Sequence, residues 1–294
     1  MQIKYGFKKE WLHSSRTFRL AGLIITILSF SISIPLLYKM LDVMLAMMES
    51  LETEAPSVLT MLLSSAATIE NPMGELSEIY SEILEADVVH SLSMTNIAGN
   101  SLLIVMLILM DPCGGEQKKR ATIIPSCSGL EYFDYLVPKF VLYPVIVFVC
   151  GFLSALISGY MCNAMFETGQ MSNELILIGA VLCAVFMIFV LCIFMAIGLC
   201  TSRPGVTTVM VYLGLNFVPG ILSYLGLNDY HPFTLYHLIS GGMYIEEGFS
   251  LADSAVSITV GAALSLVICG VMFFMTHAVL KAKKITNQED KPEF

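Results

Sequence analysis

The chain has 294 residues, of which 56% are hydrophobic and 13% charged, and its mean hydropathy is +0.77. A soluble domain carries about a quarter charged residues, so this composition excludes that class and predicts an integral membrane protein. The net charge of −9 argues against nucleic acid as a partner. No long hydrophilic block separates the apolar runs, so we expect a single membrane domain over residues 1–294.

Six apolar runs are candidate membrane spans, because a helix needs about 20 apolar residues to cross about 30 Å of hydrocarbon. We therefore predict an all-α integral membrane protein with six transmembrane helices. In chain order the runs are 20–38, which Pro35 closes, 97–110 with a start near Leu92, 136–160, 175–200, a run beginning near Val206, and 254–280. External loops are expected over 39–91 and 228–253.

The basic residues indicate the orientation of these spans. With the N-terminus inside, fourteen of the fifteen Lys and Arg residues fall on the cytoplasmic side, and Lys39 alone falls outside. Both termini are then cytoplasmic, in agreement with the positive-inside rule. We expect a multi-pass protein of the cell membrane, specifically the bacterial cytoplasmic membrane.

The N-terminal segment 1–19 has its own pattern. Ile3, Phe7, Trp11 and Phe18 fall near one helical face, with Lys and Arg residues around them. This pattern predicts an interfacial helix at the inner leaflet before the first span. A plain positive anchor for topology is a compatible interpretation.

The first external loop is acidic, with ten Asp and Glu residues between Lys39 and Ser91. It is either a solvated cap or a surface that attracts cationic substrates. Met and Leu at helical spacing over 41–51 predict an amphipathic helix within it.

The fifth run contains Pro219-Gly220 after about fourteen residues, which is about two thirds of the hydrocarbon thickness. Proline breaks the helical hydrogen-bond ladder, so we expect a split fifth span with a short re-entrant element on the outer side. Asn216 either satisfies carbonyls freed by the break or lines a cavity. The candidates for lining a substrate pathway are Asn100, Ser101, Asn216 and Pro219.

Enzyme motifs are missing from the sequence. It contains no HExxH, GxSxG or GxxxxGK[ST] pattern, and its eight cysteines form no CxxC pair or metal-ligand spacing. We therefore predict no catalytic residue, no metal site and no cofactor bound by this chain.

The segment 114–140 is a polar island with the basic cluster Lys118-Lys119-Arg120. A basic segment between two spans is read as cytoplasmic, where it can meet a soluble partner. A solvated loop that sets topology is the alternative.

The chain resembles a permease subunit of a type-2 ATP-binding-cassette exporter over nearly its whole length. The shared features are a basic interfacial helix, six spans, a large first external loop, and a split fifth span followed by the Pro-aromatic stretch 231–237. The most specific match is the acidic, basic, Thr, Pro, Ser and Lys order of Glu116, Lys118, Lys119, Arg120, Thr122, Pro125, Ser126 and Lys139. Ala121 stands where the family has Gly, and the interval from Thr122 to Pro125 is shorter than is common.

The resemblance implies that a separate cytoplasmic ATPase, which uses ATP-Mg, docks on a coupling segment at 114–138. The implied coupling residues are Glu116, Lys118, Lys119, Arg120, Thr122 and Tyr132. A second permease chain, identical or related, would complete the pathway in the bilayer. The alternatives are an ATP-independent secondary transporter and a non-transporting assembly or immunity protein. Relatives carry peptides, antibiotics, lipids and ions, so the resemblance does not name the substrate.

Overall fold

The computed structural model describes residues 2–54, 84–115, 132–201, 203–226, 229–245 and 249–289. These residues form helices joined by short turns, and no strand occurs among them. Six of the described helical segments are long and apolar enough to cross a membrane, which confirms an all-α, multi-pass membrane protein. They are Arg19–Met44, Ala86–Ile108, Phe133–Met165, Asn173–Thr201, Pro204–Tyr224 and Leu251–Ala282.

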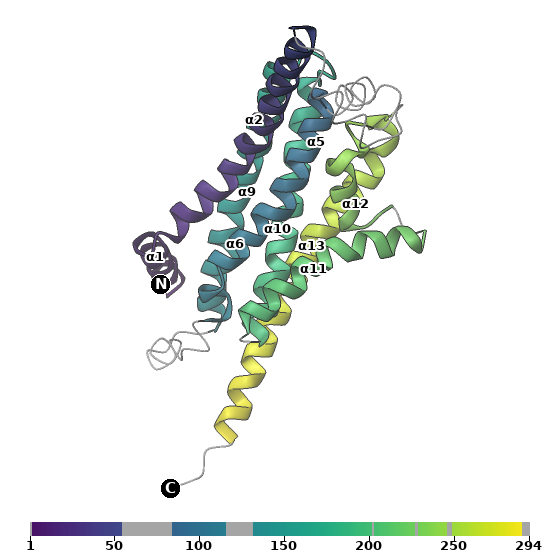
Figure 1. Cartoon of the computed structure of the whole chain (residues 1–294). Coiled ribbons are helices and arrows are strands. Elements are labelled where there is room, and N and C mark those ends of the chain that lie inside the picture. Colours follow the sequence, from purple (N-terminus) through teal and green to yellow (C-terminus); the bar gives the residue numbers. More distant parts are fainter. Residues whose placement is uncertain are drawn as a thin grey trace, which may run out of the picture.

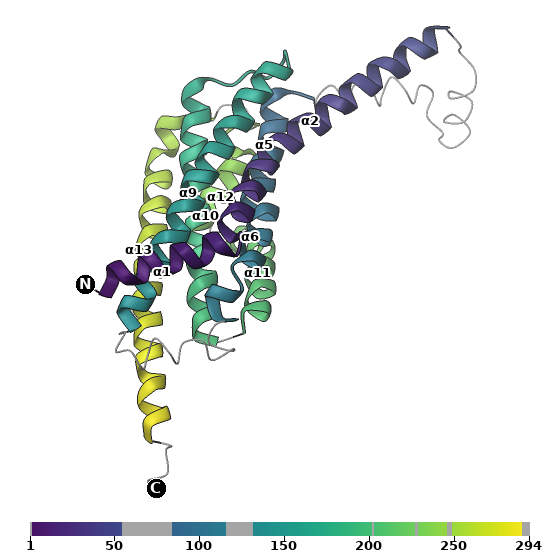
Figure 2. The same cartoon turned by 90° about the vertical axis from the view of Figure 1, so that its left-hand side faces the viewer.

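Helix α1 (Gln2–Arg16) precedes the first span and differs from it in direction. Phe18 has a φ of 56°, which turns the chain sharply before helix α2 (Arg19–Glu54) begins. Figure 2 shows α1 lying across the bundle while α2 runs along it and extends beyond it. This arrangement is the one expected of an interfacial helix followed by a span.

The second span is built from several short segments in succession. They are α5 (Ala86–Asn96), the π-helical segment η1 (Ile97–Ser101), α6 (Leu102–Ile108) and the π-helical segment η2 (Asp111–Gly115). Cys113 and Gly114 leave the helical conformation inside η2, so the span ends in a kinked turn. The predicted upstream extension of this span is therefore correct and reaches further than Leu92.

Helices α9 (Tyr132–Met165) and α10 (Asn173–Thr201) form the centre of the molecule. Helix α10 is mostly buried, and it contacts α9, α13, α11 and α12. Pro138 and Pro144 lie within α9 without ending it, because the neighbouring hydrogen bonds carry the helix past each missing donor. The buried residues of α10 join the main apolar core, which spans the whole bundle.

The last part of the chain comprises α11 (Pro204–Tyr224), the short α12 (Pro232–His237), the π-helical segment η3 (Leu238–Gly242) and α13 (Leu251–Glu289). In Figure 1 the later part of α11 bends away from the other helices and projects sideways. Segments α12 and η3 return to the bundle, where α12 contacts α10 and α13 and η3 contacts α5.

Two expected interruptions at proline differ in the structure. Helix α11 stays helical through Pro219 and Gly220 and ends at Tyr224, so the predicted break at this pair is wrong. Likewise Pro35 does not close the first span, because α2 continues to Glu54. A proline removes one backbone donor and bends a helix, but the neighbouring hydrogen bonds can carry the helix onward.

The expected external loops are also shorter than predicted. Residues 39–54 belong to α2 and residues 86–91 to α5, while 55–83 lie outside the described residues. In the second predicted loop, 228–253, the structure has the helical segments α12 and η3 and the start of α13 at Leu251.

The spans alternate in direction, so both described chain ends point to the same side (Figure 1). That side carries η2, the turn between α10 and α11, and the late part of α13. Four cations belong to the elements on this side: Arg19 begins α2, Lys139 lies in the first part of α9, Arg203 directly precedes α11, and Lys281 lies in the late part of α13. Lys39 lies in the later part of α2, away from this side. We call this side the basic end.

Candidate functional site

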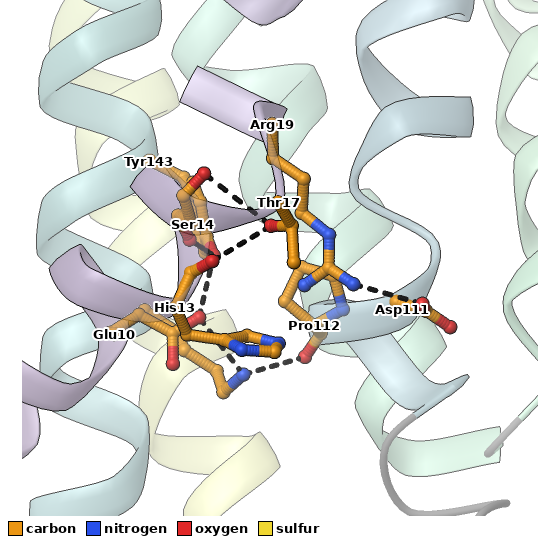
Figure 3. Close-up of polar contacts among 9 residues, drawn as sticks. Glu10, His13, Ser14, Thr17, Arg19, Asp111, Pro112 and Tyr143 are labelled. Carbon is orange, nitrogen blue, oxygen red and sulfur yellow. Dashed lines mark hydrogen bonds and ion pairs between the residues drawn. The ribbon is translucent and has the colours of Figure 1, made fainter. Parts of the chain in front are cut away.

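A buried polar cluster lies at the basic end, where α1 crosses the start of α9. We call it the Lys139 cluster, and it comprises Glu10, Ser14, Pro112, Lys139 and Tyr143. Three elements contribute to it: α1 supplies Glu10 and Ser14, η2 supplies Pro112, and α9 supplies Lys139 and Tyr143. Figure 3 shows the α1 side chains and Tyr143 converging there.

Lys139 is the centre of this cluster, and its side chain is fully buried. Its Nζ donates to Glu10 Oε1 at 3.3 Å and to the carbonyl oxygen of Pro112 at 3.0 Å. The ring centroid of Tyr135 lies 4.9 Å from the same nitrogen. One ammonium group therefore links α1 to η2 from a position on α9.

Glu10 is held as a carboxylate by its neighbours. The Tyr143 hydroxyl donates to Glu10 Oε1 at 2.5 Å. Because a tyrosine has only one hydroxyl proton, the Ser14 hydroxyl is the donor in its 2.7 Å hydrogen bond with the Tyr143 oxygen. Burial alone raises the pKa of Glu10, but the charge of Lys139 and the hydrogen bonds from Tyr143 and Lys139 outweigh it. The net pKa of Glu10 lies below its ordinary value, so the pair is ionic at neutral pH.

A second ion pair runs alongside the cluster. Arg19 Nη2, at the start of α2, lies 2.9 Å from Asp111 Oδ2, at the start of η2 (Figure 3). The Arg19 side chain is mostly buried, whereas that of Asp111 is 41% exposed. This pair ties the first span to the end of the second.

Segment η2 is also pressed directly against α10. A Cβ on Gly114, whose φ is 139°, would lie 2.5 Å from the carbonyl oxygen of Gly198, and a Cβ on Gly198 would collide with the carbonyl oxygen of Cys113. Glycine at both positions allows the two backbones to touch. The end of the second span is thus fixed from two sides, by α10 and by the Lys139 cluster.

These contacts surround the predicted coupling segment. Segment η2 ends at Gly115 and α9 begins at Tyr132, so the Lys139 cluster fastens both ends of the intervening stretch. Glu116, Lys118, Lys119, Arg120 and Thr122 lie outside the described residues. Tyr132 is the first residue of α9. The assigned coupling roles of these residues therefore stay predictions.

The pathway candidates separate into two groups. Asn100 and Asn216 are exposed and lie on either side of Tyr212: the Tyr212 hydroxyl donates to Asn100 Oδ1 at 3.2 Å, and Asn216 Nδ2 donates to the Tyr212 carbonyl oxygen at 2.8 Å. Asn100 also donates to Asn96 Oδ1 at 2.7 Å. The second span and α11 thus share a polar strip, in which Asn100 and Asn216 are exposed and Asn96 and Tyr212 are partly buried.

Ser101 and Pro219 do not join this strip through any hydrogen bond among the described residues. Ser101 is fully buried, and its hydroxyl donates to the carbonyl oxygen of Ile97 in its own segment. Pro219 lies inside α11, is partly buried, and has no side-chain polar atom. The Asn216 side chain satisfies a carbonyl of its own helix, and the pathway-lining roles of Asn100, Ser101, Asn216 and Pro219 stay predictions.

Sequence reasoning missed a second buried polar group, which lies in the half of the bundle away from the basic end. His90 is fully buried in α5, where its Nδ1 lies 3.1 Å from Ser158 Oγ of α9 and its ring packs edge-on against Tyr244, with centroids 4.9 Å apart. His90 Nε2, Ser93 Oγ and the Tyr244 hydroxyl are buried with no hydrogen-bond partner among the described residues. His90 fell within the expected external loop, so its position gave no signal of burial.

Metal-binding groups do not assemble in the part of the chain that the structure describes. No three His, Cys, Asp or Glu side chains there gather closely enough to hold a metal ion. The seven described cysteines form no disulfide with one another.

The comparisons with known proteins leave the family open. No family model matches the chain, and neither a curated protein nor a solved structure matches it.

Proposed function

We propose that this chain is the membrane-spanning subunit of an ATP-driven exporter of the ATP-binding-cassette type, coupled to a separate cytoplasmic ATPase. The observation that carries the proposal is the Lys139 cluster. It joins α1, η2 and α9 around one buried ammonium group, so that both ends of the stretch 116–131 are fastened to the same point.

Such a connection could transmit movement of the coupling segment to the membrane spans. A force applied to Glu116, Lys118, Lys119, Arg120 or Thr122 would reach the second and third spans together, because Lys139 bonds to Pro112 at the end of one from within the other. The basic residues offer charge to an ATPase groove, and ATP-Mg would be bound and hydrolysed by that partner. This chain then needs no nucleotide site and acts as a permease, not as an enzyme.

The pathway in this proposal follows the polar strip. Exposed polar side chains such as those of Asn100 and Asn216 are unfavourable against lipid at membrane depth, so they favour contact with water, substrate or another chain. A second permease chain, identical or related, facing Asn100 and Asn216 would enclose the pathway.

The proposed orientation places both termini and the basic end in the cytoplasm, in the cytoplasmic membrane of a bacterium. The basic end holds Arg19, Lys139, Arg203 and Lys281, which fits the positive-inside rule.

The test is affinity purification of the chain from its native membranes, followed by identification of the proteins that accompany it. We expect a P-loop ATPase, and we expect Arg120→Gln or Glu116→Gln to lower its recovery about tenfold, as loss of one interfacial charge partner does. The exposed cation Lys39 provides the matched control: Lys39→Gln should leave recovery unchanged. If no ATPase accompanies the wild-type chain, the proposal is wrong.

A proton-coupled secondary transporter is the second candidate, and one observation favours it. His90 is an ionisable side chain fully buried within a membrane span, and such residues often mark proton pathways. In that case His90→Gln would abolish transport driven by a proton gradient, and ATP depletion at a fixed gradient would leave transport intact. The exporter proposal requires the opposite result for ATP depletion.

A further inference from the structure

Helix α1 carries a surface that the bundle does not use. Its inner face consists of Gly6, Glu10 and Ser14, which are buried and spaced four residues apart. At Gly6, helices α1 and α9 are so close that a Cβ on this residue would lie 2.9 Å from the carbonyl oxygen of Asp134. The fully buried positions of α1 are therefore small or polar, and none of its large apolar side chains is fully buried.

Those large side chains are aromatic and remain exposed. The exposed fraction is 66% for Tyr5 and 52% for Trp11, and Phe18 at the junction with α2 reaches 78%. An amphipathic helix in a soluble protein would turn such residues inward. Here the inward positions are taken by Glu10 and Ser14.

Four cations lie among these aromatic residues. Lys4, Lys8, Lys9 and Arg16 are all exposed, and within the described residues no carboxylate forms an ion pair with them. Glu10, the one acidic residue of α1, points away from them into the Lys139 cluster. The outer surface of α1 is therefore purely cationic in its charge.

The place of α1 determines what can meet this surface. The helix lies across the bundle at the basic end, directly before Arg19, where the first membrane span begins (Figure 2). A helix in this position lies at the level of the lipid headgroups, parallel to the membrane surface. Aromatic rings favour that level, and cations there attract anionic headgroups.

We propose that the outer surface of α1 is a docking site for anionic phospholipid headgroups, and that their binding holds α1 against α9. The inner contact is anchored by Glu10 on Lys139, so lipid charge outside and the Lys139 cluster inside stabilise the same helix position. This proposal concerns α1 and the lipid alone, so it stands or falls independently of any ATPase partner.

Trp11 makes the proposal measurable, because it is the only tryptophan of the chain and it lies on this surface. The full chain is placed in nanodiscs of phosphatidylcholine alone or with about 30% phosphatidylglycerol, and quenching of Trp11 by the neutral quencher acrylamide is measured in each. We expect the anionic lipid to lower the quenching constant about threefold, and high salt to remove most of that difference.

A set of variants separates lipid binding from general effects of charge. The quadruple variant Lys4→Gln, Lys8→Gln, Lys9→Gln and Arg16→Gln should lose the lipid difference. The variant Lys4→Arg, Lys8→Arg and Lys9→Arg, in which Arg16 is unchanged, retains the charge and should keep the lipid difference. A matched control, Arg203→Gln with Lys281→Gln, removes exposed cations of the basic end outside α1 and should also keep it.

Two results would overturn the proposal. One is equal quenching of the wild-type chain in both kinds of nanodisc, which would mean that another partner or water covers this surface. The other is a lipid difference that persists in the quadruple variant, since the effect would then arise elsewhere in the bundle. Thermal unfolding of each variant, followed in phosphatidylcholine nanodiscs, verifies that the comparison is made between folded proteins.

Discussion

Lys139 is a fully buried cation whose desolvation is offset by specific contacts. Burying an ammonium group costs several kcal/mol unless a counter-charge and hydrogen bonds replace the lost water. Glu10, Pro112 and Tyr135 supply those contacts, and each comes from a different part of the chain. These contacts tie α1, η2 and α9 to one another at a single point.

The pairing of Glu10 with Lys139 leads to the first prediction. Lys139→Met leaves the Glu10 carboxylate buried without its counter-charge. Glu10→Gln likewise leaves the Lys139 ammonium group buried without a counter-charge. Each single change should lower the free energy of unfolding by roughly 3–5 kcal/mol, whereas the double variant should lose clearly less than the sum. The measurement is SDS-induced unfolding of the purified chain in mixed micelles, arranged as a double-mutant cycle.

The exposed pair Lys39–Asp42 is a suitable control for this cycle. Its nitrogen and oxygen are 2.7 Å apart, but both side chains are about 40% exposed. Water screens such a pair, so Lys39→Met should change stability by about 0–1 kcal/mol. Additive single effects at Glu10 and Lys139 would mean that the two charges do not stabilise each other.

At the scale of the elements, sequence patterns located the spans but not their ends. Apolar runs identify residues that face lipid or core, and all six spans lie where those runs are. Helix α2 nevertheless continues from Lys39 to Glu54, since polarity alone does not end a helix. His90 and Ser91 were read as the end of a loop, although both are buried among neighbouring helices.

In the Lys139 cluster, the sequence indicated Lys139 itself but not its partner. Lys139 stood out as a cation at the start of the third span, but its partner Glu10 lies 129 residues away in sequence. Periodicity within α1 marked the aromatic face as the notable one, because Gly6, Glu10 and Ser14 do not form an apolar stripe. The actual contact face of α1 is polar, so no hydrophobic pattern could reveal it.

The contact between η2 and α10 gives a prediction at the same scale. Gly198→Ala places a methyl group against the carbonyl oxygen of Cys113, which must push η2 away from α10. Because both partners are backbone, the strain cannot be relieved by a rotamer change. We expect a loss of about 1–3 kcal/mol in SDS-induced unfolding, as overpacking generally causes.

Gly214→Ala in α11 is the matched control, since a Cβ there meets nothing within 4 Å. Alanine favours a helix by up to about 1 kcal/mol over glycine, so this variant should be as stable as the wild type or more so. If Gly198→Ala is equally harmless, the approach of η2 to α10 is looser than the structure shows.

At the scale of the whole molecule, the alternation of the spans gathers described cations at one end of the bundle. Arg19 at the start of α2, Arg203 before α11 and Lys281 late in α13 share that end, and the turn between α9 and α10 lies at the other. Crossing a membrane in either direction is sterically equivalent for such a bundle. Only the charges distinguish the two, and they favour the basic end inside.

Reporter fusions in a bacterial host test this orientation. We expect a fluorescent protein fused after Glu289 to be bright, because it folds on the cytoplasmic side. Alkaline phosphatase inserted after Gly169, in the turn between α9 and α10, should be active, because it needs the oxidising outer side. The exchanged reporters at the same two sites are the controls and should both be silent. An active phosphatase after Glu289 would invert the assignment, and with it the face on which any ATPase could dock.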